Sequence, residues 1–181
     1  MIRITDISHS FDDKQLFNGM NFVLNNGVHA IVGESGSGKT TVLRAIAGLL
    51  TPTAGKVEAD KPIAVSFQEN RLFPWYSALK NVAIVSDQES AEIILTELGL
   101  GDSLTKKPSE LSGGMKKRVS LARALIANSK TVLLDEPFAG LDEATAMRTL
   151  EVIKKYSVGK TVLISTHNLS IANSLDTVIE I

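Results

Sequence analysis

Residues 33–41 read Gly33-Glu34-Ser35-Gly36-Ser37-Gly38-Lys39-Thr40-Thr41, and this stretch decides the fold. It matches the phosphate-loop pattern G-x-x-x-x-G-K-[ST] at every specified position. The short apolar run 28–32 precedes it and predicts a buried strand. Apolar side chains then recur at helical spacing, which predicts a helix with one buried face: they are Val42, Leu43, Ile46, Leu49 and Leu50. A strand, a glycine-rich turn and a helix start together predict a binding site for a nucleoside triphosphate.

The phosphate loop suits such a ligand through its backbone geometry and its charge. Glycines let successive N–H groups converge on a phosphate, and the start of a helix adds partial positive charge. Lys39 can reach the β- and γ-phosphates, and the Thr40 hydroxyl can ligate Mg²⁺. The alternative is a glycine-rich turn with a chance lysine. The full motif between a strand pattern and a helix pattern makes that alternative a poor one.

The overall composition limits the classes of function. With 181 residues the chain is long enough for one domain with its own core. A net charge of −1 and a pI of about 6.3 provide no basic field for nucleic acid or anionic lipid. The strongest basic cluster, Lys116-Lys117-Arg118, is expected to be a solvated helix face. The absence of cysteine excludes disulfides and thiolate metal sites, and no apolar run approaches the ~18 residues that span a bilayer.

Apolar runs alternate with amphipathic patterns, which predicts an α/β fold with a parallel sheet covered by helices. Ile2, Ile4 and Ile7 predict an edge strand, and with a strand at 20–24 they form a small β edge expected to be antiparallel. Residues 69–127 show helical and loop patterns, which predict a helical subdomain inserted in a single domain, 1–181. Further strands are expected at 62–67, 131–134, 161–165 and 178–181, of which the first three are expected to be buried.

Two further motifs follow the phosphate loop. Asp135 and Glu136 come directly after an apolar run, at the carboxyl end of a buried strand, where α/β folds bind ligands. One carboxylate can hold Mg²⁺ through water and the other can polarise the attacking water, unless both simply cap the next turn. The run Leu111-Ser112-Gly113-Gly114-Met115 opens a helix and predicts a second anion-binding helix start, or an ordinary serine N-cap.

The order of these motifs resembles that of the nucleotide-binding subunit of ATP-binding cassette (ABC) transporters, over essentially the whole chain. The run Leu-Ser-Gly-Gly-Met-Lys-Lys-Arg-Val-Ser-Leu-Ala-Arg-Ala-Leu at 111–125 is close to diagnostic of that family. Residues 67–75 resemble the corresponding region of bacterial importers of the nitrate, sulfonate and taurine type. The resemblance implies ATP and Mg²⁺ as cofactors and ATP hydrolysis that energises transport across a membrane.

The resemblance also implies a role for each motif residue. The phosphate loop is similar to the Walker A loop, and Asp135 and Glu136 are similar to the Walker B aspartate and the catalytic glutamate. Catalytic roles are implied for Lys39, Glu136 and His167, and Mg²⁺ contacts for Thr40, Gln68 and Asp135. The resemblance further implies that Phe11 stacks on adenine and that Gln68 senses the γ-phosphate. Residues 139–142 are similar to the D-loop, and His167 is similar to the switch histidine. From the residues alone, a minor core position for Phe11 is as well supported as adenine stacking.

Partners are implied in the same way. Two cassettes, identical or different, would pack head-to-tail, so that Ser112, Gly113 and Gly114 contact nucleotide bound at Lys39 of the partner subunit. A transmembrane permease would dock near residues 72–76, where three aromatic side chains gather; the alternative is that they form a small core of the helical insertion. A solute-binding protein is a further partner of importers. The expected location is the cytoplasmic face of the cell membrane, through the permease.

The chain departs from the family's usual pattern at several positions. Met115 replaces the commoner Gln, Gly140 lies in the D-loop, and Asn168 stands where Asp is usual. The chain stops at Ile181, so a minimal cassette without a regulatory appendage is expected. The pattern favours import over export. Two alternatives remain: a non-transport cassette of DNA repair, translation or iron–sulfur assembly, and a phosphate-loop nucleotide kinase, which would lack Leu-Ser-Gly-Gly.

Overall fold

A computed structural model describes residues 1–11 and 14–181, without the side chains of Phe11 and Lys14. The described chain divides into two compact units. The sheet unit comprises Met1–Val65, Ser129–Asp135 and Gly159–Ile181, and the helical unit comprises Ser66–Asn128 and Glu136–Val158. The helical unit therefore contains the segment 69–127 and also Glu136–Val158, which the sequence patterns place in the α/β core.

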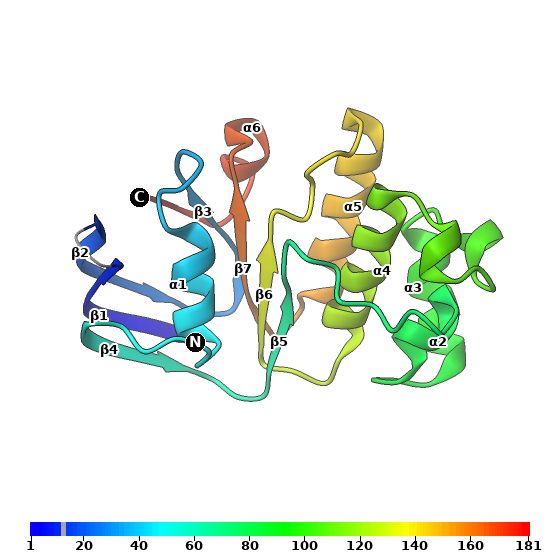
Figure 1. Ribbon diagram of the computed structural model, residues 1–181, viewed down its shortest axis with the longest axis horizontal. Helices are drawn as coiled ribbons and strands as arrows, with labels where there is room; N and C mark the ends of the chain where they lie inside the picture. Colours follow the sequence, from blue (N-terminus) through cyan, green and yellow to red (C-terminus); the bar gives the residue numbers. More distant parts are fainter. Residues whose placement is uncertain (12–13) are drawn as a thin grey trace. The chain divides into compact units, whose positions relative to one another are not determined.

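The sheet unit is built on a five-stranded sheet with the strand order β5-β6-β7-β3-β8 (Figure 1). The strands are β3 (Gly27–Val32), β5 (Ile63–Ser66), β6 (Thr131–Asp135), β7 (Thr161–Thr166) and β8 (Thr177–Glu180). The pairs β3–β7, β3–β8 and β6–β7 are parallel. Every residue of β6 and β7 is buried, as is typical of inner strands in a parallel sheet. The predicted α/β class with a parallel sheet is confirmed.

A second, antiparallel sheet has the order β2-β1-β4, with β1 (Ile2–Phe11), β2 (Lys14–Leu24) and β4 (Ala54–Ala59). The prediction that Ile2, Ile4 and Ile7 open an edge strand is wrong, because β1 lies in the middle and all three side chains are buried. Strand β4, whose residues are exposed or only partly buried, pairs with the second side of β1. So weakly apolar a segment does not predict this pairing from the sequence. A register shift between Ile4 and Ile7, where Asp6 has φ 48°, explains their unequal spacing.

Helix α1 (Lys39–Ile46) covers the core of the sheet unit. Its residues Val42, Leu43 and Ile46 are buried in one cluster with side chains of both sheets. The predicted helix extends too far: α1 ends at Ile46, Gly48 adopts φ 73°, and Leu49 is exposed. A glycine in the left-handed region ends the helix although the apolar spacing continues.

The helical unit contains α2 (Ala78–Ala83), α3 (Gln88–Glu97), α4 (Gly113–Ile126), α5 (Glu143–Tyr156) and two 3₁₀ turns, Gly101–Ser103 and Pro108–Glu110. Each α-helix begins after a side chain that accepts a backbone N–H three residues later, and these N-caps are Ser77, Asp87, Ser112 and Asp142. No helix in the described part of the chain is long and apolar enough to cross a membrane.

Candidate functional site

The phosphate loop joins β3 directly to α1, so the predicted strand, turn and helix are all present. Gly36 and Gly38 have φ of 84° and 106°, which side chains other than glycine rarely adopt. A Cβ at Gly33 would collide with the carbonyl oxygen of Ile181 and lie 2.6 Å from the hydroxyl of Ser37. The loop is therefore a turn that requires glycine at these positions, as is typical of phosphate-binding turns.

The Lys39 side chain folds back over this loop and is only 8% exposed. Its ammonium donates hydrogen bonds to the carbonyls of Gly33, at 2.7 Å, and Glu34, at 2.9 Å. These two bonds hold the positive charge beside the phosphate loop. A phosphate bound by the loop would thus lie within reach of this ammonium.

The hydroxyl of Ser37 is buried and has no hydrogen-bond partner among the residues that the structure describes. Buried polar atoms are rarely left unsatisfied, so a hydroxyl at this place in a glycine-rich loop is suited to bonding a ligand oxygen. A phosphate oxygen would satisfy it. The residues present therefore fit a nucleoside triphosphate.

Asp135 ends β6 and is almost fully buried. Its Oδ2 accepts the hydroxyl of Thr40 at 2.8 Å, and its Oδ1 accepts that of Ser165 at 2.6 Å. Two of the predicted Mg²⁺ contacts are thus adjacent. Among the described residues no group of three or more His, Cys, Asp or Glu could hold a metal alone. A hydroxyl and one carboxylate still fit Mg²⁺, because this ion usually completes its shell with phosphate oxygens and water.

Ser165 was missed by the sequence analysis. It lies opposite Asp135 in the parallel pairing of β6 with β7. Its only signal in the sequence is its place at the end of a buried apolar run, which does not reveal the partner strand.

A pocket of about 460 Å³ adjoins the start of the phosphate loop. It is lined by Val32, Gly33, Glu34, His167, Leu169, Glu180 and Ile181. The exposed His167, predicted as the switch histidine, thus shares a hollow with the loop. Asn168 caps α6 (Leu169–Ala172), its side chain accepting the N–H of Ile171 at 3.1 Å. The side chain of Phe11, predicted to stack on adenine, lies outside the described residues.

Four predicted site residues belong to the helical unit: Gln68, Ser112, Gly113 and Gly114. Ser112 caps α4 by accepting the N–H of Met115 at 3.2 Å, and both it and Gly113 are exposed. Apart from its chain neighbours and its own helix, a Cβ at Gly113 would meet no described atom within 4 Å, so the helix start is open in the part of the chain that the structure describes. The serine N-cap interpretation is therefore correct, and it leaves the first N–H groups of the helix available to an anion. Gln68 is exposed, and its γ-phosphate contact stays a prediction.

The basic cluster of α4 is not the solvated face that its charges predicted. Lys117 is only 9% exposed, and its ammonium donates to the carbonyl of Glu136 at 2.9 Å. The guanidinium of Arg118 donates to the carbonyl of Leu98 at 2.8 Å. A count of like charges did not reveal that two of the three side chains satisfy backbone carbonyls.

The aromatic segment 72–76 is a loop whose side chains lie largely in solvent. Trp75 is 64% and Phe73 37% exposed, so the alternative that these two form a core is excluded. The rings of Phe73, Trp75 and Tyr76 pack on one another, with centroids 5.6–6.1 Å apart. They form one exposed aromatic cluster.

The loop is held by Asn81 of α2, which is completely buried and was missed by the sequence analysis. Its side-chain amide donates to the carbonyls of Phe73, Tyr76 and Ser77 at 3.0–3.1 Å and accepts the N–H of Phe73 at 2.8 Å. Four bonds from one side chain fix the backbone that presents the aromatic rings.

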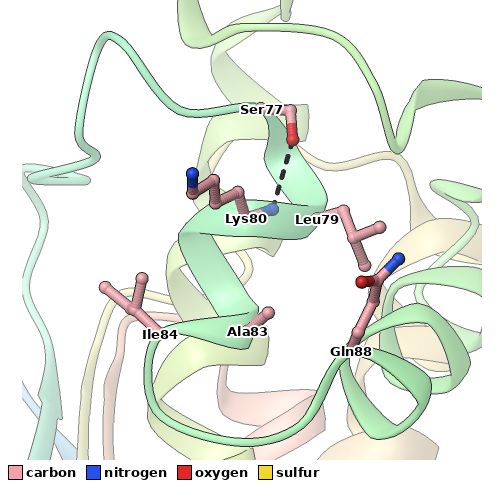
Figure 2. A pocket seen from close by; sticks show the side chains of 6 residues that line it. All are labelled: Ser77, Leu79, Lys80, Ala83, Ile84 and Gln88. Atoms are coloured by element: carbon pink, nitrogen blue, oxygen red, sulfur yellow. Dashed lines mark hydrogen bonds between the residues drawn. The ribbon is translucent and has the colours of Figure 1, made fainter.

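A second pocket of about 460 Å³ lies over α2. Figure 2 shows its lining side chains, which are Ser77, Leu79, Lys80, Ala83, Ile84 and Gln88. The Lys80 ammonium lies 4.7 Å from the centroid of the Tyr76 ring. The pocket and the aromatic cluster therefore adjoin on the surface of the helical unit.

Comparison with known proteins gives a consistent picture. Residues 17–139 match the sequence model of a family described as ABC transporter. The chain is 40% identical, over 95% of its length and 76% of the relative, to the aliphatic sulfonates import ATP-binding protein SsuB of Corynebacterium glutamicum. It is 40% identical to SsuB 2 of Pseudomonas syringae pv. syringae, over 93% of the chain but 64% of that protein. It is 37% identical to the thiamine import ATP-binding protein ThiQ of Haemophilus influenzae, over 93% of the chain and 89% of the relative.

Among solved structures, the chain is similar to the dimeric ATP-binding cassette MJ0796 in a post-hydrolysis state bound to ADP and Pi. The TM-score is 0.89 with 28% sequence identity, over 100% of this chain and 94% of that one.

Proposed function

The chain belongs to the ABC transporter family of ATP-binding domains, and from this premise we propose that it hydrolyses ATP to energise solute import through a membrane transporter. The observation that carries the proposal is the phosphate-loop site. The buried hydroxyl of Ser37 is suited to bonding a phosphate oxygen, and the hydrogen-bonded pair Thr40 and Asp135 is suited to binding the cation that accompanies a triphosphate. Import is favoured over export because the relatives include ATP-binding proteins of sulfonate and thiamine import.

Each part of the site has a separate task in this proposal. The loop N–H groups and Lys39 bind the β- and γ-phosphates, while Thr40 and Asp135 hold Mg²⁺, which neutralises phosphate charge when bound. Glu136 accepts a proton from the attacking water, and His167 lies by the loop to contact the γ-phosphate. Phosphoryl transfer depends mainly on positioning and charge stabilisation, so these groups need only be assembled correctly.

A second cassette would complete the site. The N-terminus of α4 is a second anion-binding helix start, in addition to the phosphate loop that binds the triphosphate of this chain. Ser112 to Gly114 would therefore contact the nucleotide of the partner subunit. The similarity to a dimeric cassette supports association with a second cassette subunit.

The permease would dock on the aromatic cluster and the neighbouring pocket. Exposed aromatic rings are typical anchors of protein interfaces, and a loop fixed in advance by Asn81 loses little conformational entropy on binding. The segment follows Gln68 closely in sequence, so one movement could respond to both the γ-phosphate and the transporter.

Transport assays test the proposed function directly. The chain would be reconstituted in vesicles with the membrane subunit that co-purifies with it, and phosphate release and solute movement would be measured together. ATP-dependent accumulation on the cassette side supports import, whereas movement away from it indicates an exporter. Phosphate transfer to a nucleotide acceptor would instead support the kinase alternative.

Trp75→Ala should weaken assembly with the membrane subunit about 30-fold and uncouple transport, while ATP binding stays unchanged. Truncating an aromatic anchor costs an interface about 2 kcal/mol or more. Val158→Ala, which shortens another exposed apolar side chain of the helical unit, is the matched control. Pull-down with the membrane subunit measures the effect. Full assembly and full transport with Trp75→Ala would show that the cluster is not the docking site.

Asn81→Leu should lower the free energy of unfolding by about 2–4 kcal/mol, because it leaves partners of four hydrogen bonds unsatisfied. Folded Asn81→Leu protein should also bind the membrane subunit more weakly, since the aromatic loop is no longer fixed. Denaturant unfolding measures the first effect and pull-down the second. Asn128→Leu, at an exposed position of the same unit, should change neither. Wild-type stability in Asn81→Leu would contradict the role given to this side chain.

A further inference from the structure

Lys117 is a buried cation whose ammonium is directed at the protein backbone. It lies in α4, immediately after Met115 and Lys116, and both it and Glu136 belong to the helical unit. Its ammonium donates to the carbonyl of Glu136 at 2.9 Å. Burying an ammonium is costly unless it is hydrogen-bonded, so this contact satisfies a need of Lys117 itself. The same contact bears on Glu136, whose carboxylate has the proposed role of general base.

Glu136 has an unusual backbone conformation. Its φ is 50°, in the left-handed region, which is disfavoured about 5- to 30-fold for residues with a Cβ. Its carbonyl also accepts the N–H of Ala139 at 3.2 Å, which closes a turn. Two donors therefore meet on one carbonyl oxygen, and together they fix the orientation of the peptide that follows Glu136.

We propose that Lys117 is a positioning residue for ATP hydrolysis, which holds the Glu136 backbone in its left-handed conformation and thereby sets the direction of the Glu136 carboxylate. The inference rests on the proposed role of Glu136 as general base. The direction of the Cα–Cβ bond follows from φ and from the plane of the next peptide. Without the lysine, the backbone relaxes toward negative φ and the carboxylate leaves its working position.

Lys117→Met is the principal test, because methionine is unbranched, similar in length and unable to donate a hydrogen bond. If the competent conformation loses its support, kcat for ATP hydrolysis by the purified full-length chain should fall about 5- to 30-fold. KM for ATP and the affinity for ATP should change less than about threefold, since the phosphate loop is untouched. Lys154→Met, which removes an exposed lysine of the same unit, controls for the loss of charge and should keep wild-type kcat.

A double-mutant cycle separates positioning from a merely structural role. In a Glu136→Gln background the base is already absent, so adding Lys117→Met should lower the residual rate no further. A further fall of the same size, or wild-type kcat in Lys117→Met alone, would overturn the inference. Wild-type hydrolysis in Glu136→Gln alone would instead overturn the proposed catalytic role of Glu136, so the two failures are distinguishable.

Should Lys117→Met not fold, Lys117→Arg decides. The guanidinium keeps the buried charge and can still donate, but it is longer and its donors have a fixed planar geometry, so the Glu136 carbonyl must shift to accept the bond. A lowered kcat at unchanged ATP affinity supports the inference, and a wild-type kcat contradicts it.

Discussion

Lys39→Ala is expected to weaken ATP binding about 100-fold or more. The substitution removes the ammonium held over the phosphate loop, and each charge-assisted hydrogen bond that this group would make to a phosphate contributes about 1.5–3 kcal/mol. The backbone N–H groups remain, so weak binding of triphosphate should persist. Titration calorimetry with ATP measures the change in affinity.

Two observations keep this result from being confused with a folding defect. Lys39→Ala also removes the bonds to the carbonyls of Gly33 and Glu34, so thermal unfolding without nucleotide is measured in parallel. Lys56→Ala, at an exposed lysine of β4 in the same unit, should bind ATP like the wild type. Wild-type affinity in folded Lys39→Ala would refute the assignment of the phosphate loop as the nucleotide site.

Glu136→Gln is expected to lower the rate of ATP hydrolysis by about 10²- to 10⁴-fold while ATP binding survives. The amide keeps the size of the side chain and its capacity for hydrogen bonding but cannot accept the proton of the attacking water. Single-turnover phosphate release at saturating ATP and Mg²⁺ measures the chemical step without product release.

The same variant tests the proposed dimer. If Ser112 to Gly114 contact the nucleotide of the partner subunit, ATP that is bound but not hydrolysed should hold two chains together. Size-exclusion chromatography with light scattering, with and without ATP, measures this association. A Glu136→Gln chain that stays monomeric at saturating ATP, alone and with the membrane subunit, would contradict the head-to-tail arrangement.

The α/β class, the phosphate loop and the family could all be predicted from the sequence, because they depend on local patterns and on the order of those patterns along the chain. The glycines of the loop are required by backbone conformations that only a few neighbouring residues determine, as the φ values of Gly36 and Gly38 illustrate. The helix starts at Ser112 and Asp142 are likewise local, since a capping side chain bonds a backbone N–H three residues away.

Pairings between distant segments were decided only by the tertiary structure. The inner position of β1 depends on pairing with β4, about 50 residues away, whose own sequence is too weakly apolar to predict it. The bond from Ser165 to Asp135 depends on the order of strands in the sheet. The burial of Lys117 and Asn81 depends on the backbone carbonyls that the fold places beside them. The sequence does not distinguish a polar side chain that faces water from one that bonds a backbone acceptor.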